Sequence, residues 1–122
     1  MLRGRLLTES LRVGAELAVE DLVVTSLVRR DLSASVIASQ PDVWTFLDFE
    51  APDARADELA EALTRVLRSE DGWYADFRVG DDHVVAFAGH AFRYRRGDEA
   101  GRAQAVAHGR AAGTPEHQLD WD

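Results

Sequence analysis

Residues 73–96 read WYADFRVGDDHVVAFAGHAFRYRR, and their pattern decides the fold. From residue 73 to 79, apolar and polar side chains alternate, which is the period of a half-buried strand. The residues GDD at 80–82 and GH at 89–90 are typical of hairpin turns. The strands predicted around these turns cover residues 73–79, 83–88 and 91–96. The stretch therefore predicts a three-stranded antiparallel meander.

Three further strands are predicted upstream, where β-branched, aromatic and leucine residues gather in short runs. They cover Leu2–Leu7, Leu22–Arg30 and Val43–Glu50. Residues 9–21 carry apolar side chains at several alternate positions, but Gly14 and the acidic residues interrupt them. We therefore expect this segment to be partly loop.

Two helices are predicted, one on each side of the meander. In residues 53–68, four apolar side chains fall on one helical face, with Asp53 placed to cap the start and Gly72 to end it. These side chains are Leu59, Leu63, Val66 and Leu67. Asp98 begins the second helix, which runs to residue 112 and is stopped by Gly113 and Pro115.

The second helix carries a stripe of small residues, and the tail after it carries large apolar ones. The stripe consists of Gly101, Ala105, Gly109 and Ala112. It predicts a close approach of this helix to the sheet. Leu119 and Trp121 would be out of place in a disordered tail, so we expect the tail to be docked.

The element order predicts an α+β fold: an antiparallel sheet of about five to six strands, with two helices packed on one face. Residues 1–122 form a single domain in this prediction. Two strands, 43–50 and 83–88, are apolar on both faces, so the second face needs a cover. Either residues 9–21 fold over it, or a second copy does. We predict a homodimer, with Trp44 and Phe46, or Val85 and Phe87, at the interface.

Composition excludes several classes of chemistry. The chain has no cysteine and no lysine, so disulfides, thiolate metal sites, Schiff bases and the P-loop lysine are excluded. No cofactor is predicted. The net charge of −8 argues against nucleic-acid binding, and no apolar stretch is long enough to span a membrane. A cytoplasmic protein is predicted. Its acidity provides solubility or, alternatively, attracts a basic protein partner.

The C-terminal part resembles a family of small uncharacterised bacterial proteins. The resemblance rests on GWYADF, on VVAFAGHAFRYRRGD and on the closing AHGRAAGTPEHQLDW, within roughly residues 73–121. It extends over the N-terminal half only in outline. It implies one domain and a bacterial source, and it implies no particular chemistry.

The strongest candidate anion site is Arg93, Arg95, Arg96 and Gly97, at the entry to the second helix. Arginine forks match the oxygens of phosphate or carboxylate, and a helix N-terminus favours anions. The alternative is structural: Arg93 and Arg95 pair across the meander with Asp76 and other acids, and Asp98 caps its own helix.

Tyr74 and Asp76 form a second candidate polar site, in which Asp76 is placed to act as a general base. His83 and His90, together with Asp76 or Asp120, would be a weak metal site, because no pair of histidines has helical ligand spacing. We therefore predict no metal.

Two function classes remain open. The first is a non-enzymatic protein-interaction or regulatory module that uses a sheet face and the acidic surface. The second is a small enzyme or anionic-ligand-binding protein that uses the polar residues of the meander. A cavity where Tyr74 and Asp76 converge with Arg93 and Arg95 would favour the second class. A flat apolar face buried by a second chain would favour the first.

Overall fold

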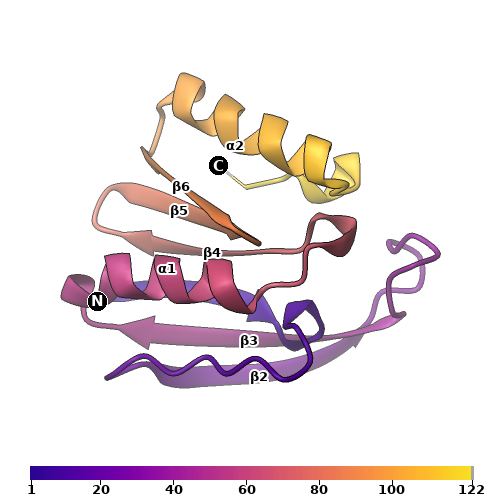
Figure 1. Ribbon diagram of the computed structural model, residues 1–122, viewed down its shortest axis with the longest axis horizontal. Helices are drawn as coiled ribbons and strands as arrows, with labels where there is room; N and C mark the ends of the chain where they lie inside the picture. Colours follow the sequence, from indigo (N-terminus) through magenta and orange to yellow (C-terminus); the bar gives the residue numbers. More distant parts are fainter. Residues whose placement is uncertain (122) are drawn as a thin grey trace.

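A computed structural model of the chain describes residues 1–121 and contains one six-stranded antiparallel sheet with two α-helices (Figure 1). The strands lie side by side in the order β2-β3-β1-β4-β5-β6. Their bounds are β1 Leu2–Leu7, β2 Val23–Asp31, β3 Val43–Ala51, β4 Tyr74–Val79, β5 Asp82–Phe87 and β6 His90–Arg95. The helices are α1 Ala56–Val66 and α2 Glu99–Ala112. The predicted α+β class and antiparallel sheet are confirmed.

Each predicted strand is present, with ends within one residue of the prediction. The start of α1 differs. Asp53 does not cap it, because the Asp53 carboxylate pairs with the N-terminal ammonium of Met1 at 3.1 Å. A 3₁₀ turn over Asp53–Arg55 leads into the helix instead, and Arg55 occupies the N-cap position without a side-chain hydrogen bond. The helix ends at Val66, several residues before Gly72.

The two helices lie on opposite faces of the sheet, which corrects the prediction of two helices on one face. Successive residues of a strand point to opposite faces. In β5, Val84 and Ala86 join the cluster under α1, whereas Val85 and Phe87 join the cluster that holds Ala105 of α2. We call these the α1 face and the α2 face. The two-sided apolar pattern of β5 is thus satisfied within one chain.

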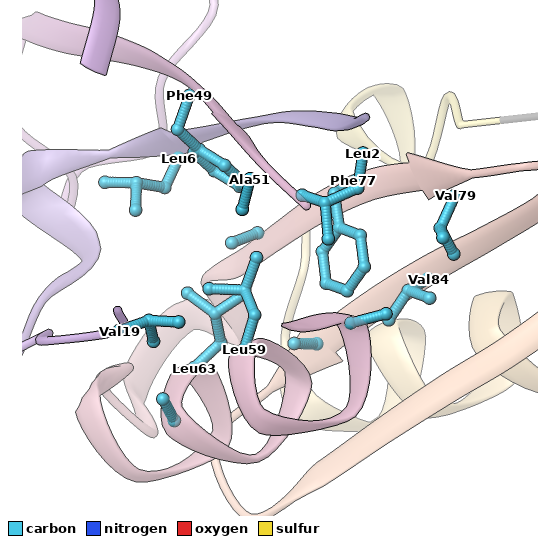
Figure 2. Close-up of a cluster of buried hydrophobic side chains, with 14 of the residues drawn as sticks. Leu2, Leu6, Val19, Phe49, Ala51, Leu59, Leu63, Phe77, Val79 and Val84 are labelled. Atoms are coloured by element: carbon cyan, nitrogen blue, oxygen red, sulfur yellow. The ribbon is translucent and has the colours of Figure 1, made fainter. Parts of the chain in front are cut away.

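The larger core lies between α1 and the sheet (Figure 2). Leu59 and Leu63 of α1 point toward Phe49 of β3 and Phe77 of β4, and all four side chains are fully buried. Residues 9–22 extend this cover rather than crossing to the other face, because Leu11, Leu17 and Leu22 pack against the same cluster. One alternative predicted that residues 9–21 cover the second face, and the structure shows that they do not.

The smaller core lies between α2 and the outer strands β5 and β6. The small-residue stripe permits the predicted close approach: a Cβ on Gly101 would lie 2.5 Å from the Tyr94 Cβ, and one on Gly109 would lie 2.8 Å from Leu119. The predicted cap is present, since the Asp98 side chain accepts from the Gly101 amide at 3.1 Å. Leu119 and Trp121 are buried in this cluster, so the tail is docked up to residue 121.

Candidate functional site

A cavity of about 600 Å³ opens on the α2 face, where β3, β1 and β4 meet the C-terminal tail. Its volume is within the range of small-molecule sites. Aromatic side chains supply much of its wall, and all three tryptophans of the chain take part. The aromatic lining residues are Trp44, Phe46, Trp73, Tyr74 and Trp121. Trp44 and Trp73 contact each other with ring centroids 5.4 Å apart.

The tail and the loop before β3 close one side of this cavity. The Gln118 side chain bonds to the Gln40 side chain and donates to the carbonyl of Ser35 at 3.3 Å. The Tyr74 hydroxyl donates to the Gln118 carbonyl at 2.8 Å, which ties the tail to β4. The position of this wall therefore depends on the docking of residues 117–121.

A row of polar side chains crosses the floor of the cavity. Asp48, Arg5 and Asp76 are direct cross-strand partners on β3, β1 and β4, so their side chains share the α2 face. The Arg5 guanidinium binds the Asp48 carboxylate through two hydrogen bonds of 2.6 and 3.1 Å. This fork holds the pKa of Asp48 below its usual value and raises the pKa of Arg5.

A buried histidine continues the row behind Asp76. His83 is fully buried; its Nε2 lies 2.7 Å from Asp76 Oδ2 and its Nδ1 lies 3.0 Å from the Tyr94 hydroxyl. A neutral imidazole satisfies both contacts if Nε2–H donates to the carboxylate and Nδ1 accepts from the phenol. The Tyr94–His83–Asp76 relay thus runs from β6 to β4 and presents an oriented carboxylate to the cavity, where Asp76 is partly exposed.

The region around Tyr74 is buried and electronegative. Burial raises the pKa of the Tyr74 phenol well above its ordinary value, and the carboxylates of Asp120 and Asp76 raise it further. The phenol also lies 3.4 Å from Asp120 Oδ1. A neutral hydroxyl and two carboxylates therefore face this part of the cavity.

The structure separates the two predicted groups of site residues. Tyr74 and Asp76 both line the cavity, but the predicted Arg93 and Arg95 do not join them there. The arginines that line it are Arg5 and Arg78 instead. Arg93 lies on the α1 face, where its guanidinium binds Asp82 at 2.8 Å and reaches Asp57 at 3.5 Å. Arg95 shares that face. The anion site of Arg93, Arg95, Arg96 and Gly97 stays a prediction.

Sequence reasoning missed Arg5, Tyr94 and the role of His83. It paired His83 with Asp76 only as possible metal ligands, and the two do lie together, with a phenol rather than a third metal ligand beside them. Within residues 1–121, no three His, Asp or Glu side chains are grouped as a metal site requires. For Arg5 the missing signal is the register of β1 against β4, which a single sequence does not give. His83 and Tyr94 are cross-strand partners in the β5–β6 hairpin.

Comparison with known proteins does not assign the chain to a family. No protein family, no curated protein and no solved structure matches the chain. Among residues 1–121, no helix is both long and apolar enough to cross a membrane.

Proposed function

We propose that this protein binds a small organic cation with an aromatic or apolar body in the cavity on its α2 face. The observation that carries the proposal is the Asp76 carboxylate, which the buried His83 and Tyr94 hold in place inside an aromatic wall. Of the two function classes open to the sequence, this arrangement favours a ligand-binding protein. The proposed ligand is a cation, whereas the sequence predicted an anionic ligand for this class.

The charge of the cavity favours a cation over an anion. Asp76, Asp71 and Asp120 line it together with Arg5 and Arg78. The Arg5 charge is offset by the Asp48 fork just outside the lining. Carboxylates are therefore in excess over guanidinium groups around the ligand.

The aromatic wall suits the same ligand. An ammonium group is attracted to the face of a tryptophan or tyrosine ring, and this attraction strengthens away from water. An apolar or aromatic body would pack against Trp44 and Trp73, while the ammonium would take the Asp76 carboxylate as its counter-ion. Neither contact requires the His83 relay to change its hydrogen bonds.

Tryptophan fluorescence tests the proposal directly, because all three tryptophans line the cavity. Phenethylammonium and 3-phenylpropionate share one aromatic body and carry opposite charges. We expect phenethylammonium to change the emission in a saturable way, and 3-phenylpropionate to bind at least about ten times more weakly, a difference of about 1.4 kcal/mol. Equal binding of the two probes, or tighter binding of the anion, would overturn the proposal.

Matched variants assign the effect to Asp76. Asp76→Asn should weaken phenethylammonium binding about tenfold, because it removes the counter-ion. Asp82→Asn is the control, since Asp82 lies on the same sheet but pairs with Arg93 on the α1 face. If Asp76→Asn does not fold, Asp120→Asn makes the same test at the other carboxylate beside Tyr74. If Asp76→Asn folds and binds phenethylammonium as tightly as the wild type, or if its substitute Asp120→Asn does so, the proposal is contradicted.

Cytoplasmic location, a bacterial source, a homodimeric state and a basic protein partner also remain proposals. The formal charge of −8 supports a basic partner only in a general way. A cross-linking experiment in a bacterial cytoplasm, with the wild-type chain as bait, is the test for such a partner.

A further inference from the structure

Strand β2 is an edge strand with an unusually apolar surface. It is nine residues long, and among the strands of residues 1–121 its one neighbour in the sheet is β3. Leu27 is 62% exposed and Val24 is 51% exposed; Val23 and Val28 are also exposed. Long, apolar edge strands template pairing with another chain, and proteins commonly shorten or charge them for this reason.

A β-bulge between Val24 and Ser26 sets which side chains share a face. The register with β3 shifts by one residue there, so Thr25 is the extra residue. Val23 and Val28 pair with Glu50 and Phe46, which places them on the α2 face. Val24 and Leu27 pair with Phe49 and Leu47, which places them on the α1 face.

We propose that β2 pairs antiparallel with β2 of a second copy, so that one sheet continues through a two-fold homodimer. The pairing sets Val24 of each copy opposite Leu27 of the other, and Val23 opposite Val28. Because of the bulge, each of these pairs joins residues of the same face. All four exposed apolar side chains of the strand then find an apolar neighbour, which is the unit of sheet stabilisation.

The charges at the two ends of β2 favour the same register. Before β2 the chain turns over residues 20–21, so this register brings Arg30 of one copy to the end of the strand where that acidic turn of the other copy lies. Glu20 and Asp21 share the single guanidinium of Arg55, at 2.9 and 3.9 Å, so this segment keeps an excess of negative charge. A register centred on Arg29 would instead place the Arg29 side chains of the two copies opposite each other, and Val28 of one copy opposite Arg30 of the other. Self-complementarity of shape and charge therefore points to a second copy rather than to an unrelated peptide.

Light scattering coupled to gel filtration tests the assembly. We expect the mass of a dimer for the wild-type chain at micromolar concentration, and the mass of a monomer for Leu27→Glu, which would bury two carboxylates in the pairing. Val13→Glu is the matched control and should remain dimeric, because Val13 is 99% exposed and lies in a turn outside β2. A monomeric wild type overturns the proposal, and so does a Leu27→Glu variant that stays dimeric.

Cysteine cross-linking tests the register, and the absence of native cysteines keeps the result clean. Directly opposed residues have Cα atoms about 4.5–5.5 Å apart, which suits a disulfide. Residues 24 and 27 of one strand are about 9 Å apart and do not cross-link within a chain. The double variant Val24→Cys/Leu27→Cys should form a reducible covalent dimer, whereas each single variant should not. Efficient cross-linking by Leu27→Cys alone would refute the proposed register.

Discussion

Gly4 lies in the middle of β1, at a point where the sheet has no room for a side chain. A Cβ at this position would lie 2.4 Å from the Asp76 carbonyl oxygen and 2.4 Å from the Phe77 Cβ. Both obstacles belong to β4, its neighbour in the sheet, so neither moves aside as the end of a flexible side chain would. The glycine thus allows β1 and β4 to approach, and it thereby sets the distance between Arg5 and Asp76 on the floor of the cavity.

Gly4→Ala should therefore destabilise the fold strongly. Overpacking a core position costs about 1–3 kcal/mol, and we expect the upper end or more because backbone atoms are in the way. Urea unfolding measures the loss. Arg3→Ala, on the same strand and in an exposed ion pair with Glu50, should cost less than about 1 kcal/mol. Equal effects of the two substitutions would contradict this account of Gly4.

His108 should titrate below the ordinary histidine pKa. Its ring packs on Phe87 and stacks on His90 with centroids 4.8 and 5.5 Å apart. Burial lowers the pKa of His108 from 6.5, and the charge of His90 lowers it further. NMR titration of the imidazole checks this. His90→Gln should raise the pKa of His108 only partly, because burial is the larger cause. A His108 pKa at or above 6.5 would contradict the prediction.

The sign of the resulting pH dependence follows from proton binding. Below pH 6.5 the unfolded chain protonates at His108 before the folded one does. The contribution of a neutral His108 to the free energy of unfolding is therefore complete above pH 6.5. It falls as the pH drops towards the pKa of His108 in the folded state, and it changes no further below that pKa. His108→Gln should therefore reduce the difference in unfolding free energy between about pH 7.5 and pH 5.

At the residue scale, the sequence predicted the two side chains of the cavity that share one strand. Tyr74 and Asp76 alternate with Ala75 and Phe77, so their common polar side follows from the period of a strand alone. Arg5 lies more than sixty positions away, and it joins them only through the β1–β4 register. Tyr94 differs, because it lies opposite His83 in the β5–β6 hairpin, a local pairing, and reaches Asp76 through that histidine. Local periodicity does not predict how strands that are distant in the sequence pair with each other.

At the element scale, the ends of α2 and the docking of the tail were predictable because each depends on a few neighbouring residues. Asp98 and Gly113 cap α2 as their chemistry requires, and Gly113 takes the left-handed φ of 102°. The start of α1 was not predictable in this way. The Asp53 carboxylate had a competing partner, the ammonium of Met1, that tertiary structure alone brings within reach.

Loss of the tail should cost both stability and the cavity wall. Leu119 and Trp121 are buried, and burial of each such side chain is worth on the order of 2–3 kcal/mol. Trp121→Ala should lower the free energy of unfolding by about 3–5 kcal/mol. Gln104→Ala, on the exposed side of α2, is the control and should change it by less than about 0.5 kcal/mol. An unchanged melting temperature in Trp121→Ala would show that the tail contributes nothing to the fold.

At the scale of the whole molecule, the prediction failed where two local patterns had to be combined. The apolar pattern of β5 predicts that both faces are buried, but the predicted arrangement places both helices on one face and leaves the other to residues 9–21 or to a second copy. In the structure, α1 and residues 9–22 cover one face, while α2 and the tail cover the outer strands on the other (Figure 1). Sequence periodicity shows that a face is apolar, and it does not show which element covers it.

Because β5 contributes to both hydrophobic clusters, we expect the two sides of the sheet to unfold together. The tryptophans line the cavity on the α2 face, whereas Leu63 is buried under α1 on the other. Leu63→Ala should cost about 2–5 kcal/mol. In a two-state domain it should move the urea midpoint by the same amount whether unfolding is followed by tryptophan fluorescence or by far-ultraviolet circular dichroism. If the fluorescence midpoint stayed in place while the dichroism midpoint fell, the two clusters would be independent and the sheet would not couple them.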